Sequence, residues 1–295
     1  MTFHRTPSGL ANLHLFYRVD AIVFVEGGDP SCSLADIIDG VYDTVSHDIR
    51  FWSIILGAYA PLRRFQFRAI GSKLNLLALA DYIAANSIAN VLVCMDRDAD
   101  DVTGTMRTSN AVLYTRGYSW ENDVWIPSTV TAIFYDVCAV AKTGLDVRAH
   151  IEEAFRHFSA SIRGVIKADI LLLQNGMDGI NRSAIRSSLR TSKHTAPSID
   201  CGHLRRAIRE RRKVVSDSIC RTSTRPVKPL ADCYGHLQAE FAFHVLVHLL
   251  RKHCKMKTIP KHLISAAALT RFELQLAQNA LADGYYRPSV AALKI

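Results

Sequence analysis

Long apolar runs are missing from this sequence. No stretch approaches the ~18 consecutive apolar residues that a membrane-spanning helix needs. The longest candidate, residues 241–250, is short and contains two histidines. The first twenty residues have no basic segment leading into an apolar core, so we expect no secretory signal peptide. These absences predict a cytoplasmic protein without a membrane partner.

Paired cysteines are missing too. The seven cysteines are scattered and none belongs to a CxxC pair, so we expect reduced thiols packed as small apolar groups. Cys233 and His236, or His244 and His248, have spacings that could bind zinc, but no fourth ligand lies at a useful spacing and we expect packing instead. The sequence also lacks GxxxxGK[ST], so the chain does not itself supply a P-loop ATPase.

Charge is divided unevenly between the two halves. Residues 1–150 carry 12 Lys and Arg against 16 Asp and Glu, a net −4, whereas residues 151–295 carry 24 against 11, a net +13. This skew indicates that carboxylates hold cations in one half while the other half attracts a polyanion. A solvated surface with no such role is the alternative.

Strand and helix patterns alternate over the first half. Short apolar runs at 21–25, 65–71, 91–96 and 111–115 predict strands, and residues 33–45 and 72–86 have helical spacing. This alternation predicts a parallel α/β sheet flanked by helices over residues 10–128. Residues 129–142, 147–172, 203–214, 236–253 and 261–284 predict a mainly helical region over 129–295, with a polar, turn-rich loop at 175–202.

Carboxylates follow two of the predicted strands. Glu26 ends the first strand, and Asp96 and Asp98 end the third. Alternate residues of a strand face the same way, so both aspartates reach one site if the strand extends that far. Ligands collect at the carboxyl ends of parallel strands, and converging carboxylates favour Mg²⁺ or Mn²⁺ acting on phosphate. Asp29 is a further candidate ligand, or it only closes the turn.

Four segments together resemble a known family: VFVEGGDP, GSKLN, VCMDRDAD and YTRGYSWENDVW. They are similar to the TOPRIM-like nucleases of the OLD class, and most of all to the nuclease effectors of PARIS anti-phage systems. The resemblance covers about residues 15–130 and, loosely, the CYGHLQAEF segment at 233–241. It implies that Glu26, Asp96 and Asp98 hold divalent metal and that Glu121 is the subgroup's additional acidic residue.

The resemblance also implies partners. In this family the nuclease works with a separate OLD- or ABC-like ATPase that holds it inactive until infection, and the implied substrate is transfer RNA. We expect the helical region to mediate homodimerisation, docking to that ATPase and contact with nucleic acid.

Three further residues near the strand ends are candidates, and two of them, Glu121 and Lys73, have two interpretations each. Glu121 lies in the first turn of a predicted helix, where the helix dipole favours an acid whatever its function. Lys73 begins another helix, where it could steady a phosphate or lie exposed. Arg116 could neutralise a phosphate of the substrate.

A basic segment spans residues 203–228. Helical spacing over 203–214 places Arg205, Arg209 and Arg212 on one face. Such a face binds nucleic-acid backbone without sequence preference. The candidate contacts are Arg205, Arg206, Arg209, Arg211, Arg212 and Lys213. The alternatives are a solvated helix or a docking surface for an acidic partner.

These patterns lead to one preferred hypothesis and two rivals. The preferred function is a metal-dependent endonuclease, with ribonuclease activity as the expectation. One rival is a HAD-like phosphatase with Asp96 as nucleophile and Asp98 as acid, and the EGGD turn after the first strand argues against it. The other is a non-catalytic regulatory subunit of an ATPase complex, in which the metal is structural.

Overall fold

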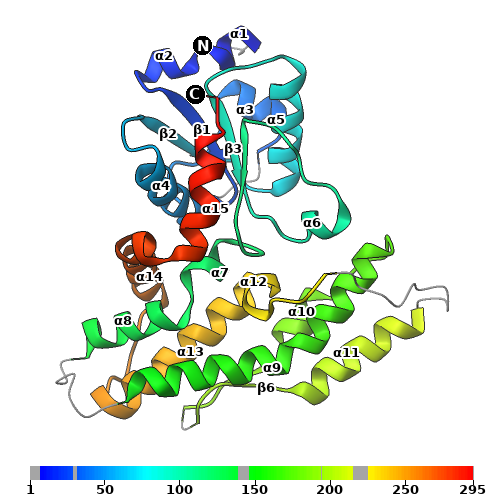
Figure 1. Cartoon of the computed structure of the whole chain (residues 1–295), viewed down its shortest axis with the longest axis vertical. Helices are drawn as coiled ribbons and strands as arrows, with labels where there is room; N and C mark the ends of the chain where they lie inside the picture. The colour runs from blue at the N-terminus through cyan, green and yellow to red at the C-terminus, as the bar shows by residue number, and fades with distance from the viewer. Residues whose placement is uncertain (1–6, 29–31, 139–145, 194, 215–224, 295) are drawn as a thin grey trace. The chain divides into compact units, whose positions relative to one another are not determined.

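Two compact units make up the protein, in a computed structural model that describes residues 7–28, 32–138, 146–193, 195–214 and 225–294 (Figure 1). The sheet unit comprises Met1–Arg97, Met106–Arg116 and Leu276–Ile295, and the helical unit comprises Asp98–Thr105 and Gly117–Gln275. The predicted functional division at residues 10–128 and 129–295 stays a prediction. The two compact units do not follow that division, because each unit is made of segments that alternate along the chain.

The sheet unit contains a four-stranded parallel sheet with the order β2-β1-β3-β4. Every position of β1 and β3 is buried, as expected for central parallel strands covered on both faces. The predicted α/β class with a parallel sheet is therefore confirmed. The strands are β1 (Ala21–Val25), β2 (Phe65–Ala69), β3 (Val91–Met95) and β4 (Val112–Tyr114).

Helices cover the sheet. Helix α5 packs against β3, and α4 packs against β2 and β1. The helix α15, close to the C-terminus, packs against α4, where the rings of Trp52 and Tyr286 meet edge to face at 6.1 Å. The helices of this unit are α1 (Pro7–Ala11), α2 (Leu13–Tyr17), α3 (Leu34–Asp39), α4 (His47–Tyr59), α5 (Lys73–Ala85), the 3-10 helix η1 (Leu276–Gln278) and α15 (Ala280–Ala291).

Two predicted helices are shorter than expected. The helix predicted over 33–45 ends at Asp39, because Gly40 adopts a φ of 87° and closes α3 with a left-handed cap. The helix predicted over 261–284 is interrupted by η1, and Asn279 then caps α15 by accepting a hydrogen bond from the Ala282 N–H. The second interruption separates α14, in the helical unit, from α15, in the sheet unit.

The helical unit is built around α9 and α13. Their apolar faces meet through aromatic rings, with Phe158 stacked on Phe241 at 4.3 Å and Phe155 edge-on to Phe241 at 5.5 Å. The predicted 175–202 loop contains a short helix and a two-stranded antiparallel hairpin. The elements are α6 (Asp100–Thr103), α7 (Trp120–Val124), α8 (Pro127–Val137), α9 (Val147–Gln174), α10 (Arg182–Arg186), β5 (Leu189–Arg190), β6 (Ser198–Ile199), α11 (Cys201–Val214), α12 (Pro229–Asp232), α13 (Gly235–Cys254) and α14 (Lys261–Gln275).

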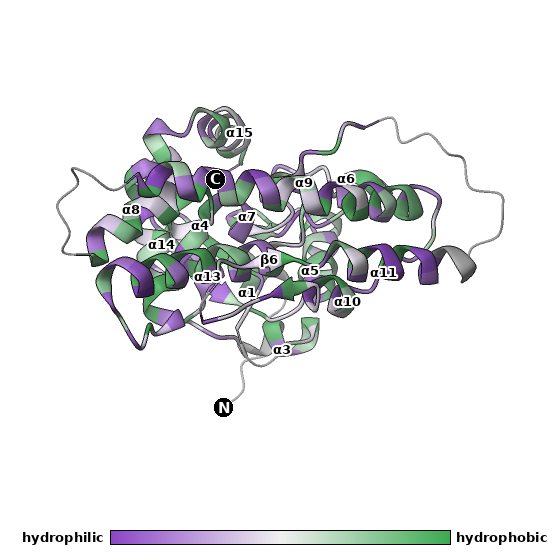
Figure 2. Ribbon diagram, turned by 90° about the horizontal axis from the view of Figure 1, so that it is seen from below, coloured by the Kyte–Doolittle hydropathy of each residue, from purple (hydrophilic) through white to green (hydrophobic). Residues whose placement is uncertain are grey.

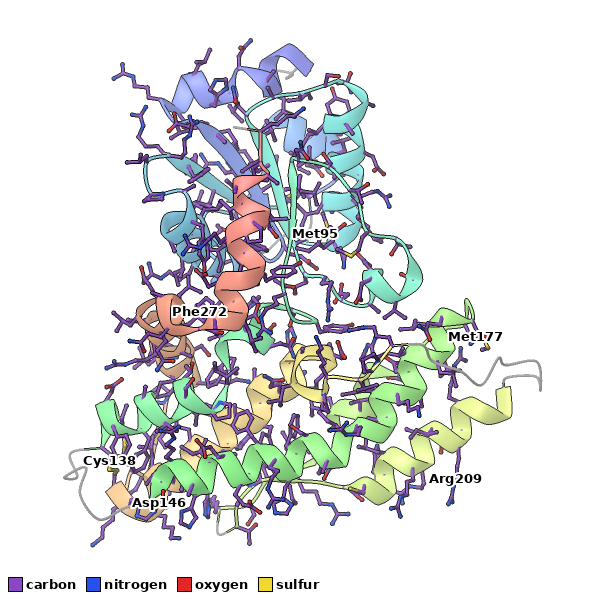
Figure 3. The ribbon with its side chains drawn as sticks, in the orientation of Figure 1. Met95, Cys138, Asp146, Met177, Arg209 and Phe272 are labelled. Carbon is purple, nitrogen blue, oxygen red and sulfur yellow. A yellow bond between two sulfur atoms is a disulfide. The ribbon has the colours of Figure 1, made fainter. Side chains whose placement is uncertain are left out.

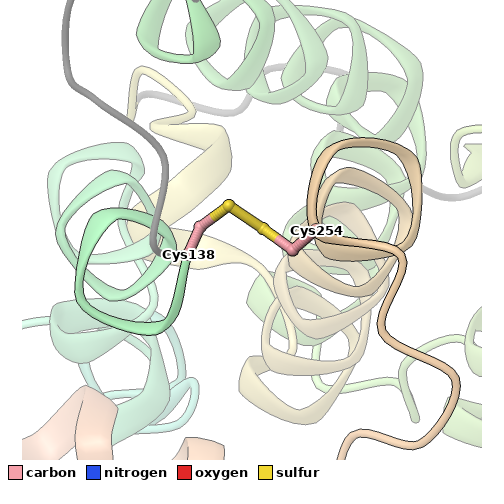
Figure 4. Close-up of a disulfide and its surroundings, with 2 residues drawn as sticks. All are labelled: Cys138 and Cys254. Carbon is pink, nitrogen blue, oxygen red and sulfur yellow. A yellow bond between two sulfur atoms is a disulfide. The ribbon is translucent and has the colours of Figure 1, made fainter.

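A disulfide joins Cys138, at the end of α8, to Cys254, the last residue of α13 (Figure 4). The expectation that the cysteines are all reduced is therefore wrong. The two residues are 116 positions apart, so no spacing motif reveals the pair, and only the packing of α8 on α13 brings their Cα atoms to 5.8 Å. Four other cysteines in the described residues form no disulfide, namely Cys32, Cys94, Cys201 and Cys233.

Each helix in the described part of the chain is too short or too polar to cross a bilayer.

Candidate functional site

Glu26 lies at the carboxyl end of β1, just before a turn that only glycine can make. Gly27 and Gly28 both have φ values of 82°, and Gly27 pairs with Gly71 through two backbone hydrogen bonds of 3.0 and 2.8 Å. A Cβ on Gly27 would lie 2.4 Å from Asp48 Oδ2. The turn therefore fixes the backbone next to Glu26 and ties the ends of β1 and β2 together.

Asp96 follows β3, the strand next to β1, and meets Glu26 directly. The backbone N–H of Asp96 donates a 3.1 Å hydrogen bond to Glu26 Oε2. Since β2 and β3 lie on opposite sides of β1, the chain changes direction across the sheet at this pair of strand ends. Such a switch point is where open parallel sheets bind ligands. We name these two residues the Glu26–Asp96 pair.

Lys73 supports the loop after β3. Its ammonium group donates to the backbone carbonyl oxygens of Asp96 at 2.6 Å and of Arg97 at 3.1 Å. The lysine therefore orders the backbone that carries the aspartate, which sequence reasoning did not anticipate. Its predicted contact with a substrate phosphate stays a prediction.

Asp98 belongs to the helical unit, whereas the Glu26–Asp96 pair belongs to the sheet unit. The idea that β3 extends to Asp98 is wrong: the strand ends at Met95, and Asp98 has a left-handed φ of 51°. Its N–H donates to the Tyr118 carbonyl at 2.6 Å. Burial, followed by the nearby Asp98 charge, raises the pKa of the Tyr118 phenol, which also hydrogen-bonds to the Asp98 side chain. Asp98 is thus held by the loop that precedes α7.

Glu121 is nearly buried in the first turn of α7, with 5% of its surface exposed. The Ser119 hydroxyl donates to Glu121 Oε2, and His236 Nδ1 lies 3.3 Å from Oε1. Gly235 allows this approach, because a Cβ there would lie 1.8 Å from Ser119 Oγ and 2.9 Å from Glu121 Oε2. The start of α13 and the start of α7 therefore meet in one polar contact, and the loose resemblance at 233–241 falls on it.

Asn122 connects the same two helices and was missed by sequence reasoning. Its Nδ2 group lies 2.8 Å from the Leu230 carbonyl, 2.9 Å from the Cys233 carbonyl and 3.2 Å from Gln238 Oε1. Its Oδ1 accepts the Ser119 N–H at 2.9 Å. No local pattern signals a partner more than 100 residues away.

Arg182 and Asp169 form a second missed group. Asp169 accepts 2.6 Å hydrogen bonds from the Arg182 guanidinium and from the Ile180 N–H. The guanidinium lies 5.3 Å from the ring centre of Tyr118 and 5.8 Å from that of Tyr234. The group therefore backs the tyrosine that contacts Asp98.

The remaining aspartates of the DRDADD run lie at the start of α6. Asp101 pairs with Arg225 at 3.1 Å, and the same arginine also donates to Asp232. Part of this acidic run is thus balanced by an arginine from the basic segment.

The basic candidates divide into three groups. Arg205, Arg206 and Arg209 are exposed on α11, much of which is hydrophilic in Figure 2, and Arg209 is labelled in Figure 3. Arg211 is already engaged, since Nε donates to the Asp178 carbonyl at 2.9 Å. Arg212 and Lys213 lie within α11, but their side chains are outside the described part of the chain.

Two other candidates complete the predicted set. The backbone N–H of Arg116 donates to the Tyr286 hydroxyl at 2.9 Å, within the sheet unit. Asp29 lies outside the described residues.

The described residues offer few groups of side chains that could bind a metal ion. Within the described ranges, no three His, Cys, Asp or Glu side chains gather as the ligands of one ion would. His244 pairs with Glu240 at 3.1 Å, consistent with packing on α13 rather than with a zinc site. Glu26 and Asp96 are joined through the Asp96 backbone N–H, and they supply two carboxylates at adjacent strand ends, the number that Mg²⁺ needs when water and substrate phosphate fill its other positions.

No family model matches the chain, and no curated protein matches it.

Proposed function

We propose that this protein is a TOPRIM-like, Mg²⁺- or Mn²⁺-dependent nuclease that hydrolyses phosphodiester bonds of RNA. One observation carries the proposal: Glu26 accepts the Asp96 N–H at the switch point of a parallel sheet. Acidic residues that follow adjacent strands supply hard oxygen ligands at one edge of the sheet, and such ligands favour magnesium or manganese.

Each candidate residue has a role in this proposal. Glu26 and Asp96 would bind the ion, with Asp98 and Glu121 as the further acidic groups that the resemblance implies. When bound, the ion activates water and stabilises the leaving oxygen of the phosphodiester. Lys73 keeps the Asp96 backbone in place, and the exposed arginines of α11 attract the polyanion.

The family resemblance adds a substrate, an oligomeric state and a partner to the proposal. It implies an anti-phage effector that cleaves transfer RNA, acts as a homodimer and is released from a separate ATPase. Each of these remains a prediction that depends on nuclease activity.

Glu26→Gln tests the proposal by removing one charge while keeping the shape of the side chain. Purified protein is incubated with total RNA and with plasmid DNA, in Mg²⁺ or in EDTA. We expect the wild-type protein to cleave RNA only with metal, and the variant to lose at least about 100-fold in rate, as when one charge-stabilising group is removed.

Asp20→Asn is the matched control, because Asp20 precedes the opposite end of β1 and bonds to the Arg64 N–H. It should cleave RNA at the wild-type rate. A Glu26→Gln variant that still cleaves RNA would contradict the proposal. Turnover of p-nitrophenyl phosphate in place of RNA would favour the phosphatase, and a folded wild-type protein that cleaves neither would favour the regulatory subunit.

A further inference from the structure

The ring of His236 is held firmly and yet lies open to solvent. It stacks on Tyr234 at 5.5 Å, with only 16° between the ring planes, and its Nδ1 is 3.3 Å from Glu121 Oε1. Despite these two contacts, 63% of the His236 side chain is exposed. Tyr234 covers one face of the ring, so the exposed surface includes the other face.

Tyr234, on which the His236 ring stacks, is itself held in place by neighbouring side chains. Tyr234 meets Tyr118 edge to face at 6.1 Å and lies 5.8 Å from the Arg182 guanidinium. Asp169 holds that guanidinium by a 2.6 Å hydrogen bond. The histidine therefore stacks on a tyrosine that belongs to an ordered cation–aromatic cluster, and little rotamer freedom remains to be lost when a ligand binds its open face.

We propose that His236 is a stacking platform for one unpaired base of single-stranded RNA. A flat ring with one free face matches a nucleobase, since RNA-binding proteins stack unpaired bases on aromatic and histidine side chains. Bases inside a duplex are stacked on both faces, so the platform selects a loop, an end or a base turned out of its helix.

The neighbours of the platform favour a nucleic acid over other flat ligands. Glu121 contacts the histidine directly, and Tyr118, next in the stack, hydrogen-bonds to Asp98. Both acids belong to the predicted metal-binding set, so a nucleotide stacked here would bring its phosphate near them. The inference rests on the proposed nuclease function and adds a base subsite to it, whereas the arginines of α11 offer contacts to the backbone only.

Base-dependent binding tests the platform. The full-length Glu26→Gln protein, chosen so that it does not cleave, is titrated with single-stranded RNA carrying 2-aminopurine, and with an abasic strand of the same length. Anisotropy reports affinity, and 2-aminopurine quenching reports stacking. We expect His236→Ala to weaken RNA binding by about 5- to 150-fold, the range for loss of one base–aromatic stack, and to leave abasic binding unchanged.

Two variants make the result specific. His236→Phe keeps a flat ring and should retain binding and quenching even though the contact with Glu121 is lost. His157→Ala is the matched control, because His157 is 70% exposed and paired with Glu153 but stacks on no described ring, and it should bind as the parent does.

Three outcomes would overturn the platform. They are equal RNA affinity of His236→Ala and its parent, an equal loss for RNA and for the abasic strand, and stacking seen only with single-stranded DNA. If wild-type protein cleaves RNA and any of these occurs, the nuclease proposal stands and the platform fails. If base-dependent binding requires His236 but no wild-type cleavage is found, the platform stands and the nuclease proposal fails.

Discussion

The sheet unit and the helical unit bury different kinds of side chain. In the sheet unit the only described buried polar residues are Arg68 and Thr115, whereas the helical unit buries nine. Those nine are Ser119, Glu121, Asn122, Asp123, Thr129, Asp169, Ser188, Asp232 and Gln238. An apolar side chain can be buried against many different apolar neighbours. A buried hydrogen bond instead requires one particular partner in one orientation.

This difference indicates that the two units are stabilised in different ways. The sheet unit is an apolar frame in which the pairing of β1 with β3 brings Glu26 to Asp96. In the helical unit, polar contacts specify how α7 meets α13, and these contacts surround Glu121 and His236. Three experiments separate the two modes of stabilisation.

Phe24→Ala should give the largest effect, because Phe24 is fully buried in the centre of β1. Cavity formation predicts a loss of about 3–5 kcal/mol in the free energy of unfolding, measured by urea denaturation. Leu62→Ala is the control, since Leu62 is 95% exposed, and it should change stability by less than about 0.5 kcal/mol. A small loss at Phe24 would mean that the sheet interior is not a tightly packed frame.

Asn122→Ala should give an intermediate effect in the helical unit. It leaves the Leu230 and Cys233 carbonyls and the Ser119 N–H without the partners they have in the structure. We expect a loss of about 2–3 kcal/mol, the range for unsatisfied buried polar groups, again by urea denaturation.

Asn110→Ala removes an exposed asparagine and is the matched control, with no change expected. If Asn122→Ala were equally neutral, the polar network would not be what specifies the pairing of α7 with α13.

Acid should weaken the helical unit slightly and selectively. Burial, then the charges of Lys252 and His253, lowers the pKa of His248, and burial with Lys252 and His150 lowers that of His253. A lowered folded-state pKa means that the stabilisation is present above the ordinary histidine value near 6.5 and is lost as the pH falls through the folded value.

Hydrogen exchange between pH 7.5 and 5.5 measures this loss. After correction for intrinsic exchange rates, α13 should lose protection while β1 and β3 keep theirs. The double variant His248→Gln, His253→Gln should remove the pH dependence, and a wild-type protein whose two units respond alike would contradict the assignment.

Much of the frame was predictable because its signals are local. The strands at 21–25 and 91–96 were recognisable as short apolar runs bounded by turns, and the glycines after Glu26 marked a turn that a larger residue cannot make. Helix ends were less predictable. Gly40 ends α3 and Asn279 begins α15, each as a capping residue. In both places the helical spacing of apolar residues continues past the cap, so the spacing alone did not reveal the boundary.

The sequence by itself determined the parallel sheet, the acidic residues at its strand ends and the basic helix, since residue periodicity and turn chemistry act over a few positions. Tertiary structure alone decided the Cys138–Cys254 bond, the Asn122–Gln238 contact and the stack behind His236. The physical reason is range. Some of these contacts join helices more than 50 residues apart, and the others form only once such helices have packed. The rotation of each helix about its axis then decides which side chains meet.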